Sequence, residues 1–121
     1  MGSEMCIRDS TAIGYEAGRD VNGDENTYLG YHAGRLASGG QENTYVGSAA
    51  GYVCTTSGNT AVGRRAFYSA TSGGYNTGLG IQAGYNITTG DFNTLIGERA
   101  ASNGSSSVSY THLTLPTILL V

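Results

Sequence analysis

The chain has 121 residues, 20 of them glycine, and a formal net charge of −3 in which every cation is an arginine. This length allows one domain at most or a fragment of a longer array, and the acidic, lysine-free composition lacks the basic footprint of a nucleic-acid-binding protein. The two cysteines, Cys6 and Cys54, form neither a CxxC motif nor a plausible zinc set.

Large apolar residues are scarce. Only 14 of the 97 residues from 11 to 107 are Ile, Leu, Val or Phe. Without a period, so few would predict disorder. With a period, they predict a thin core built one small layer at a time, in which a neighbouring coil or another chain supplies the remaining buried surface. We therefore expect the chain to oligomerise.

The two ends of the chain lack the repeat pattern described below. Residues 1–9 contain no apolar segment of a secretory signal. The string MCIRDS near this end, and VSYTHLTLPTILLV over residues 108–121, resemble translated ends of adapter-contaminated assemblies. We therefore interpret residues 1–9 and 108–121 as foreign segments and residues 10–107 as the repeat domain. The alternative is a natural N-terminal arm and a natural C-terminal strand.

A nine-residue pattern, N-T-x-φ-G-x-x-A-G with φ as Ile, Leu or Val, organises the remainder. Copies begin at Ser10 and at five asparagines, and their central glycines are spaced 16, 17, 16, 17 and 17 residues apart. A fixed period of this kind indicates a repeat architecture. The recurring positions are Asn26, Asn43, Asn59, Asn76 and Asn93; Thr11, Thr27, Thr44, Thr60, Thr77 and Thr94; and Gly14, Gly30, Gly47, Gly63, Gly80 and Gly97.

Each copy predicts a short strand followed by a bend. The T-x-φ segment alternates with period two, and the glycine after it permits a sharp bend. The connecting half holds one apolar or small residue (Val21, Leu36, Val53, Ala70, Ile87), which suits a second short strand before a glycine turn. We therefore predict an all-β fold, a parallel β-roll or β-solenoid of about six 16–17-residue coils with two short strands per coil.

Stacked coils bring equivalent side chains into columns. The asparagines are expected to form a ladder whose amides bond from coil to coil, with the threonine column beside it. The expected inward set is the φ residue, the alanine of the motif and the apolar residue of the connector. Because the alanine keeps each layer narrow, a larger side chain such as phenylalanine at Ala83 should overpack the coil.

The motif, with connectors such as residues 85–90, resembles repeats in the heads of YadA-type trimeric autotransporter adhesins and repeats of phage tail-fibre proteins. The resemblance covers about residues 10–101. It implies a parallel β-roll in which three chains associate side by side, on a bacterial cell surface or a virion. Two features depart from the autotransporter pattern: the period is longer, and Phe67 and Ala101 replace the final glycine. The longer period favours the tail-fibre group.

The residues that commonly carry chemistry form no recognisable set. His32 occupies a variable position that suits a surface residue, and His112 lies in the C-terminal tail. The serines and Cys54 have no evident base, and a Ser-Lys dyad would need a lysine. Asp24 and Glu25 beside Asn22 are compatible with a weak oxygen site, although a solvated turn is the preferred interpretation. We expect no enzyme activity, no cofactor, no metal, no nucleic-acid partner and no membrane insertion.

Two hypotheses for function follow. The first is a structural and adhesive segment of a homotrimeric fibre, with a host-surface glycan or protein as receptor. Exposed tyrosines would then serve trimer contacts or glycan stacking, or simply pack at strand edges; the candidates are Tyr28, Tyr31, Tyr45, Tyr52, Tyr68 and Tyr85. The second hypothesis is an ice-binding solenoid built on the threonine column. Against it, the threonine shares its strand face with the φ residue, which is expected to be buried.

Overall fold

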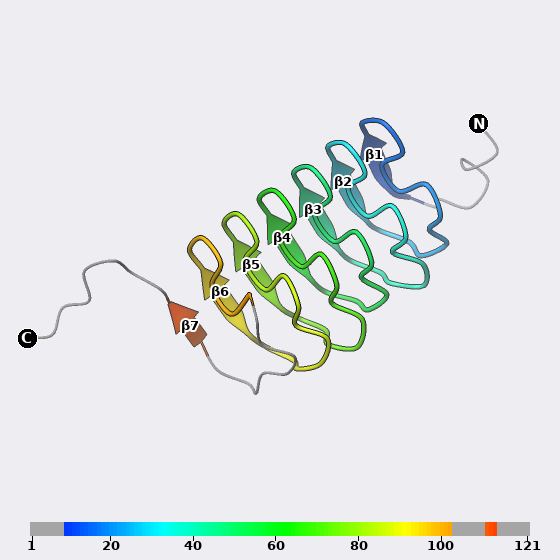
Figure 1. Cartoon of the computed structure of the whole chain (residues 1–121). Coiled ribbons are helices and arrows are strands. Elements are labelled where there is room, and N and C mark those ends of the chain that lie inside the picture. The colour runs from blue at the N-terminus through cyan, green and yellow to red at the C-terminus, as the bar shows by residue number, and fades with distance from the viewer. Residues whose placement is uncertain (1–8, 103–110, 114–121) are drawn as a thin grey trace, which may run out of the picture.

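The computed structural model describes residues 9–102 and the backbone of residues 111–113. The chain winds into stacked coils with one strand in each, and successive coils lie side by side along the stack (Figure 1). The strands are β1 (Thr11–Ile13), β2 (Thr27–Leu29), β3 (Thr44–Val46), β4 (Thr60–Val62), β5 (Thr77–Leu79), β6 (Thr94–Ile96) and β7 (Thr111–Leu113). They form one parallel sheet in sequence order, with each threonine opposite the next. This confirms the predicted parallel β-solenoid.

Strand β7 belongs to the segment 108–121 that the sequence suggested to be foreign. Its backbone nevertheless pairs with β6 in the repeat register, Thr94 opposite Thr111. The other residues of that segment, and residues 1–8, lie outside the described residues.

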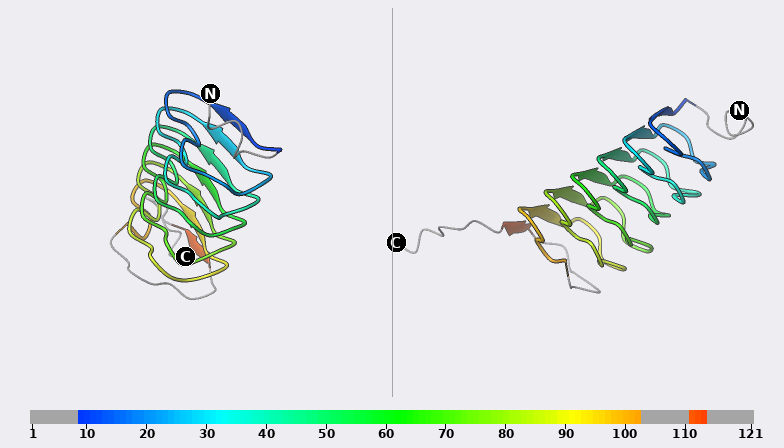
Figure 2. Two further views of the ribbon diagram at one scale, coloured as in Figure 1. Left: turned by 90° about the vertical axis from the view of Figure 1, so that its right-hand side faces the viewer. Right: turned by 45° about the horizontal axis from the view of Figure 1, so that its top comes forward.

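The predicted second strand is not formed in the described coils. Each has a single three-residue strand, and a series of turns occupies the connecting half, as the two views of Figure 2 show. Left-handed backbone positions explain the difference: in the coil of Leu36, Gly34 and Gly39 lie on either side of that residue with φ of 60° and 88°. A strand cannot continue through such residues. The turns still bond from coil to coil, for example from Leu36 N–H to Tyr52 O at 2.9 Å.

The orientation of the strands differs from the prediction. The middle residue of T-x-φ points into the coil, so that Tyr28, Tyr45 and Leu95 are fully buried, whereas the φ residues point outward. Strand alternation gives the reason. Asn26 is buried, and a residue two positions later must share its face; Tyr28 is that residue, which leaves Leu29 outside.

The connecting half contributes a second inward column. Val21, Ala70 and Ile87 are buried as predicted, but Leu36 and Val53 are only half-buried. The residues that follow those two, Ala37 and Cys54, take the inward position instead. Every inward residue stands the same number of positions after its repeat glycine. In these two coils the inward position is therefore one residue later than the sequence predicts, because the larger apolar residues Leu36 and Val53 directly precede it.

The alanines of the motif line the interior as predicted; Ala33, Ala50, Ala66, Ala83 and Ala100 are all buried. We expect Ala83→Phe to lower the free energy of unfolding by about 1–3 kcal/mol, because the added ring has no space in a fully packed layer. Chemical denaturation followed by circular dichroism would measure the change. As a control, Ser38→Phe adds the same ring at an exposed position of a connecting turn and should cost less than about 1 kcal/mol. Equal losses in the two variants would contradict the inward and outward assignment.

Candidate functional surface

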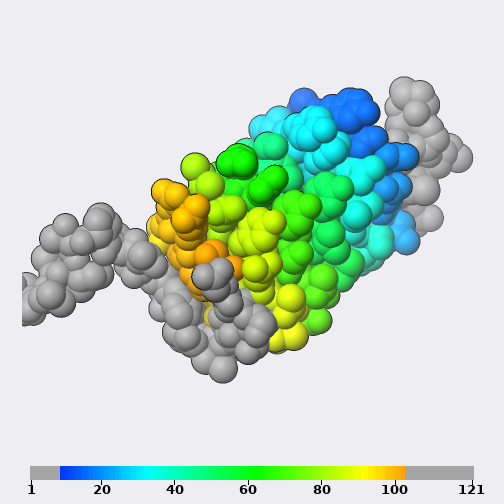
Figure 3. Space-filling view, in the orientation of Figure 1, coloured from blue at the N-terminus to red at the C-terminus, as the bar shows by residue number. Residues whose placement is uncertain are grey.

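One side of the solenoid is a regular outward face, which we call the sheet face. Alternation along each coil exposes four residues: the one before the asparagine, the threonine, the φ residue and the one after the glycine. In the coil of β2 these are Glu25, Thr27, Leu29 and Tyr31. Because the strands are parallel and in register, the four positions continue as four rows along the stack. Successive coils form adjacent bands of the molecular surface (Figure 3).

An aliphatic row runs through the middle of the sheet face. Ile13 is 60% exposed, Leu29 44%, Leu79 37% and Val62 36%, and the equivalent residues of β3 and β6 are partly exposed. The threonine row lies beside it and also faces outward, opposite to the expectation from sequence. A continuous exposed apolar row of this kind is a feature of interaction surfaces.

The predicted asparagine column lies inside the coil. In the first four of these asparagines the side-chain oxygen accepts the backbone N–H of the next: Asn43 donates to Asn26 Oδ1 at 2.9 Å, and Asn59 to Asn43 Oδ1 at 2.9 Å. Asn76 and Asn93 continue the series at 3.0 and 2.9 Å. A buried polar group needs such a partner, so these asparagines link neighbouring coils. They are fully buried and therefore have no contact with solvent or an external ligand.

The predicted glycine column lies at the end of each strand. These glycines have φ between 125° and 136°, a region that residues with a side chain avoid. The first five also approach the next coil closely: a Cβ built on Gly14 would lie 2.5 Å from the carbonyl oxygen of Gly30. The glycines are therefore required by the backbone and the stacking, and the structure gives them no chemical role.

A charged network joins the first coils at the corner after the strand. Arg19 Nη1 donates to Glu16 Oε1 at 2.7 Å, and Arg35 Nε donates to Glu16 Oε2. Arg35 Nη1 also donates to the Tyr52 hydroxyl at 2.8 Å. The hydrogen bond from Arg35 lowers the pKa of the Glu16 carboxyl, which is therefore held ionised. His32 Nε2 lies 3.1 Å from Glu16 Oε2, which places the histidine in this network.

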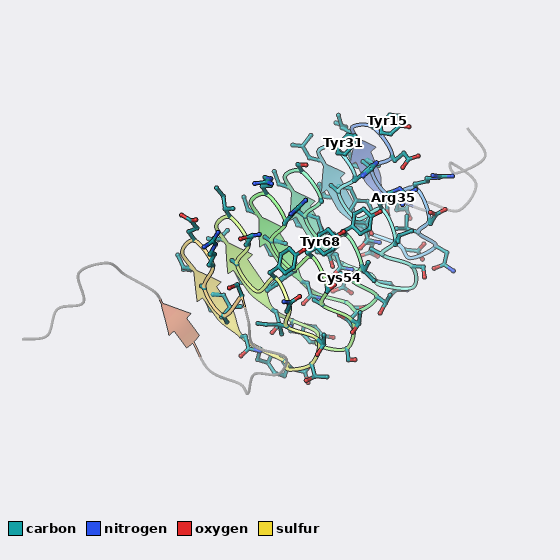
Figure 4. All side chains as sticks on the ribbon, viewed as in Figure 1. Tyr15, Tyr31, Arg35, Cys54 and Tyr68 are labelled. Carbon is teal, nitrogen blue, oxygen red and sulfur yellow. The ribbon has the colours of Figure 1, made fainter. Side chains whose placement is uncertain are left out.

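Aromatic rings stack along the same corner. Tyr52 and Tyr68 are nearly parallel at 4.9 Å between ring centroids, and Tyr68 and Tyr85 at 5.0 Å. Arg35 lies over the Tyr52 ring at 5.8 Å, extending the row toward the N-terminus. Tyr15 and Tyr31 of the first two coils, labelled in Figure 4, also stack, with 5.6 Å between ring centroids. Sequence reasoning missed these rows, although three of the tyrosines stand at equal distances after their repeat glycines.

This stacking changes the interpretation of the tyrosines. Tyr28 and Tyr45 are fully buried and are not exposed aromatic residues, contrary to the expectation from sequence. Tyr68 is stacked on both faces, by Tyr52 on one side and Tyr85 on the other. Stacking of a sugar on the Tyr68 ring would therefore require the row to separate.

Cys54 lies inside the coil, where burial raises the pKa of its thiol. A buried, protonated thiol is a poor nucleophile. Within residues 9–102, no group of three or more His, Cys, Asp or Glu side chains has the geometry to hold a metal ion. The same part of the chain contains no helix that is long and apolar enough to cross a membrane. Comparison with protein-family models, curated proteins and solved structures gives no match.

Proposed function

We propose that this repeat array is a structural and adhesive segment of a homotrimeric fibre on a virion or a bacterial cell surface, with no catalytic role. The observation that carries the proposal is the exposed aliphatic row of the sheet face. A single chain leaves this row in water along the whole stack, whereas chains packed side by side would cover it.

The construction of the stack supports a mechanical role. Backbone hydrogen bonds and the buried asparagine ladder join the coils, so the described array is hydrogen-bonded continuously along its axis. Each added coil lengthens it by about 4.8 Å without changing the cross-section. Such a unit suits a rigid spacer that holds its variable corners toward a host-surface glycan or protein.

The mass of the full chain in solution tests the proposal. We expect light scattering to give the mass of three chains, and Leu29→Glu combined with Leu79→Glu to reduce it to one, because charges in the aliphatic row oppose its burial. The matched control adds the same charge at exposed serines of the connecting turns, Ser38→Glu with Ser72→Glu, and should remain trimeric. A well-folded monomeric wild-type chain would rule the trimer out.

The outward threonine row favours a second candidate, an ice-binding solenoid. The threonines do not point into the coil, as the strand pattern predicted, but lie exposed or partly exposed on the sheet face. Regular threonines on a flat parallel sheet are what an ice-binding surface requires. Thermal hysteresis separates the candidates: activity in a monomeric chain would support ice binding, and its absence in a trimeric chain would support the fibre.

A further inference from the structure

The two borders of the sheet face differ in chemistry. The row before the asparagines, which we call the leading border, is Asp9, Glu25, Glu42, Gly58, Tyr75 and Phe92. The row after the glycines, which we call the trailing border, is Tyr15, Tyr31, Ser48, Arg64, Ile81 and Glu98. The first three coils therefore present carboxylates on the leading border and hydroxyl groups on the trailing border.

We infer that copies of this chain associate side by side through unlike borders (a head-to-tail contact around the ring). The leading border of one copy lies against the trailing border of the next. The inference rests on the proposed side-by-side assembly and specifies its contact. In a ring whose axis is parallel to the stack, every strand runs in the same sense around the axis. The end of one copy's strand then lies beside the start of the strand in its neighbour, so unlike borders meet.

Ring symmetry keeps equivalent coils at the same height, so the borders can be compared coil by coil. At the second coil Glu25 meets Tyr31, and at the third Glu42 meets Ser48; the first coil likewise pairs a carboxylate with a tyrosine. Each hydroxyl can donate a charge-assisted hydrogen bond to the carboxylate opposite it. None of these three coils places a carboxylate against a carboxylate.

The next coils are complementary in a different way. At the fourth coil Arg64 meets Gly58, which leaves the guanidinium one coil, about 4.8 Å, from Glu42 of the neighbour. At the fifth coil Tyr75 meets Ile81, and both are exposed apolar residues, 58% and 46%. The sixth coil, with Phe92 opposite Glu98, is the one described level without such a match.

The charged members of these borders are available for contact. Glu25, Glu42 and Arg64 are exposed and make no ion pair within the described part of the chain. This contrasts with Glu16, whose carboxylate is already bound by two arginines of its own chain. The proposed contact therefore requires no internal ion pair to break.

A disulfide between borders tests the contact. The variant Glu42→Cys with Ser48→Cys, prepared with Cys6→Ser and with the buried Cys54 retained, places one thiol on each border of the same coil. Within one chain the two positions are roughly 15–20 Å apart across the strand, too far for a disulfide. We expect mild oxidation to give a covalently closed trimer on a non-reducing gel, and each single-cysteine variant to stay uncrosslinked.

The matched control is Glu42→Cys with Ile81→Cys, which has the same two borders but thiols two coils apart; it should not crosslink. A wild-type chain that is trimeric by light scattering, with no crosslink in the Glu42/Ser48 variant, would overturn the head-to-tail contact and leave the fibre proposal intact. A monomeric wild-type chain would overturn both. A covalent dimer would support the border contact and contradict the trimer.

Discussion

Replacing Phe67 with alanine is expected to lower the free energy of unfolding by about 3–5 kcal/mol, because it empties the centre of the interior. Phe67 is fully buried although it stands at a motif position that is glycine in the preceding coils. Its ring lies against Gly78 and Gly84 of the next coil: a Cβ built on Gly78 would be 2.9 Å from the ring, and one on Gly84 2.2 Å. Urea denaturation monitored by circular dichroism would measure the loss.

The neighbouring coils explain why a phenylalanine is found there. In the second and third coils a tyrosine of the strand fills the interior, and the motif glycine makes room for it: a Cβ on Gly34 would lie 2.3 Å from the Tyr28 ring. In the fourth and fifth coils the equivalent strand residues are Ala61 and Gly78, and Phe67 fills the space from the other side. The large aromatic residue has therefore moved from the strand to the motif position that is otherwise glycine, and a small residue has taken its place in the strand.

This exchange gives the control for the Phe67 prediction. Phe67→Gly combined with Gly78→Tyr recreates the arrangement of the second and third coils, so the double variant should recover most of the stability lost in Phe67→Gly alone. Recovery of stability in the double variant would show that the loss in Phe67→Gly comes from unfilled volume in the interior. A double variant no more stable than Phe67→Gly would contradict the exchange.

The periodic features of the fold could be predicted from the sequence. Which side chains of each strand face the interior could not. Spacing alone identified the coils, the strand and the alanine column, because stacking repeats the same requirement in every coil. Leu29 was predicted to face the interior because it is apolar. Strand alternation from the buried Asn26 instead places it on the outside. Once a buried asparagine fixes the inward face, alternation exposes the φ residue whatever its hydropathy.

The missing second strand has a different cause. The chain instead turns at the corner that precedes it, where one site of the repeat is left-handed with φ from 53° to 60°: Glu16, His32, Ala49, Arg65, Gln82 and Arg99. Apart from His32, these residue types give no sequence signal for such a conformation, unlike glycine or asparagine. The corner network around Glu16 depends on this geometry, and it joins Arg35 across 19 residues of sequence. Only a three-dimensional structure could reveal it.

Replacing Gly63 with alanine is expected to lower the free energy of unfolding by roughly 2–6 kcal/mol, from backbone strain and overpacking together. Gly63 has a φ of 136°, and a Cβ there would lie 2.4 Å from the carbonyl oxygen of Gly80. That oxygen belongs to the backbone of the next coil, so it cannot move away as a flexible side chain would. Relieving the contact requires the fourth and fifth coils to separate.

The matched control for Gly63→Ala is Gly39→Ala. Gly39 also has a positive φ, 88°, but nothing lies within 4 Å of a Cβ built on it. That variant should therefore show backbone strain without the clash, a loss of about 1–3 kcal/mol. Comparing the two denaturation midpoints isolates the cost of forcing coils apart. If both variants lost the same stability, close stacking would not be what keeps this glycine in every copy of the motif.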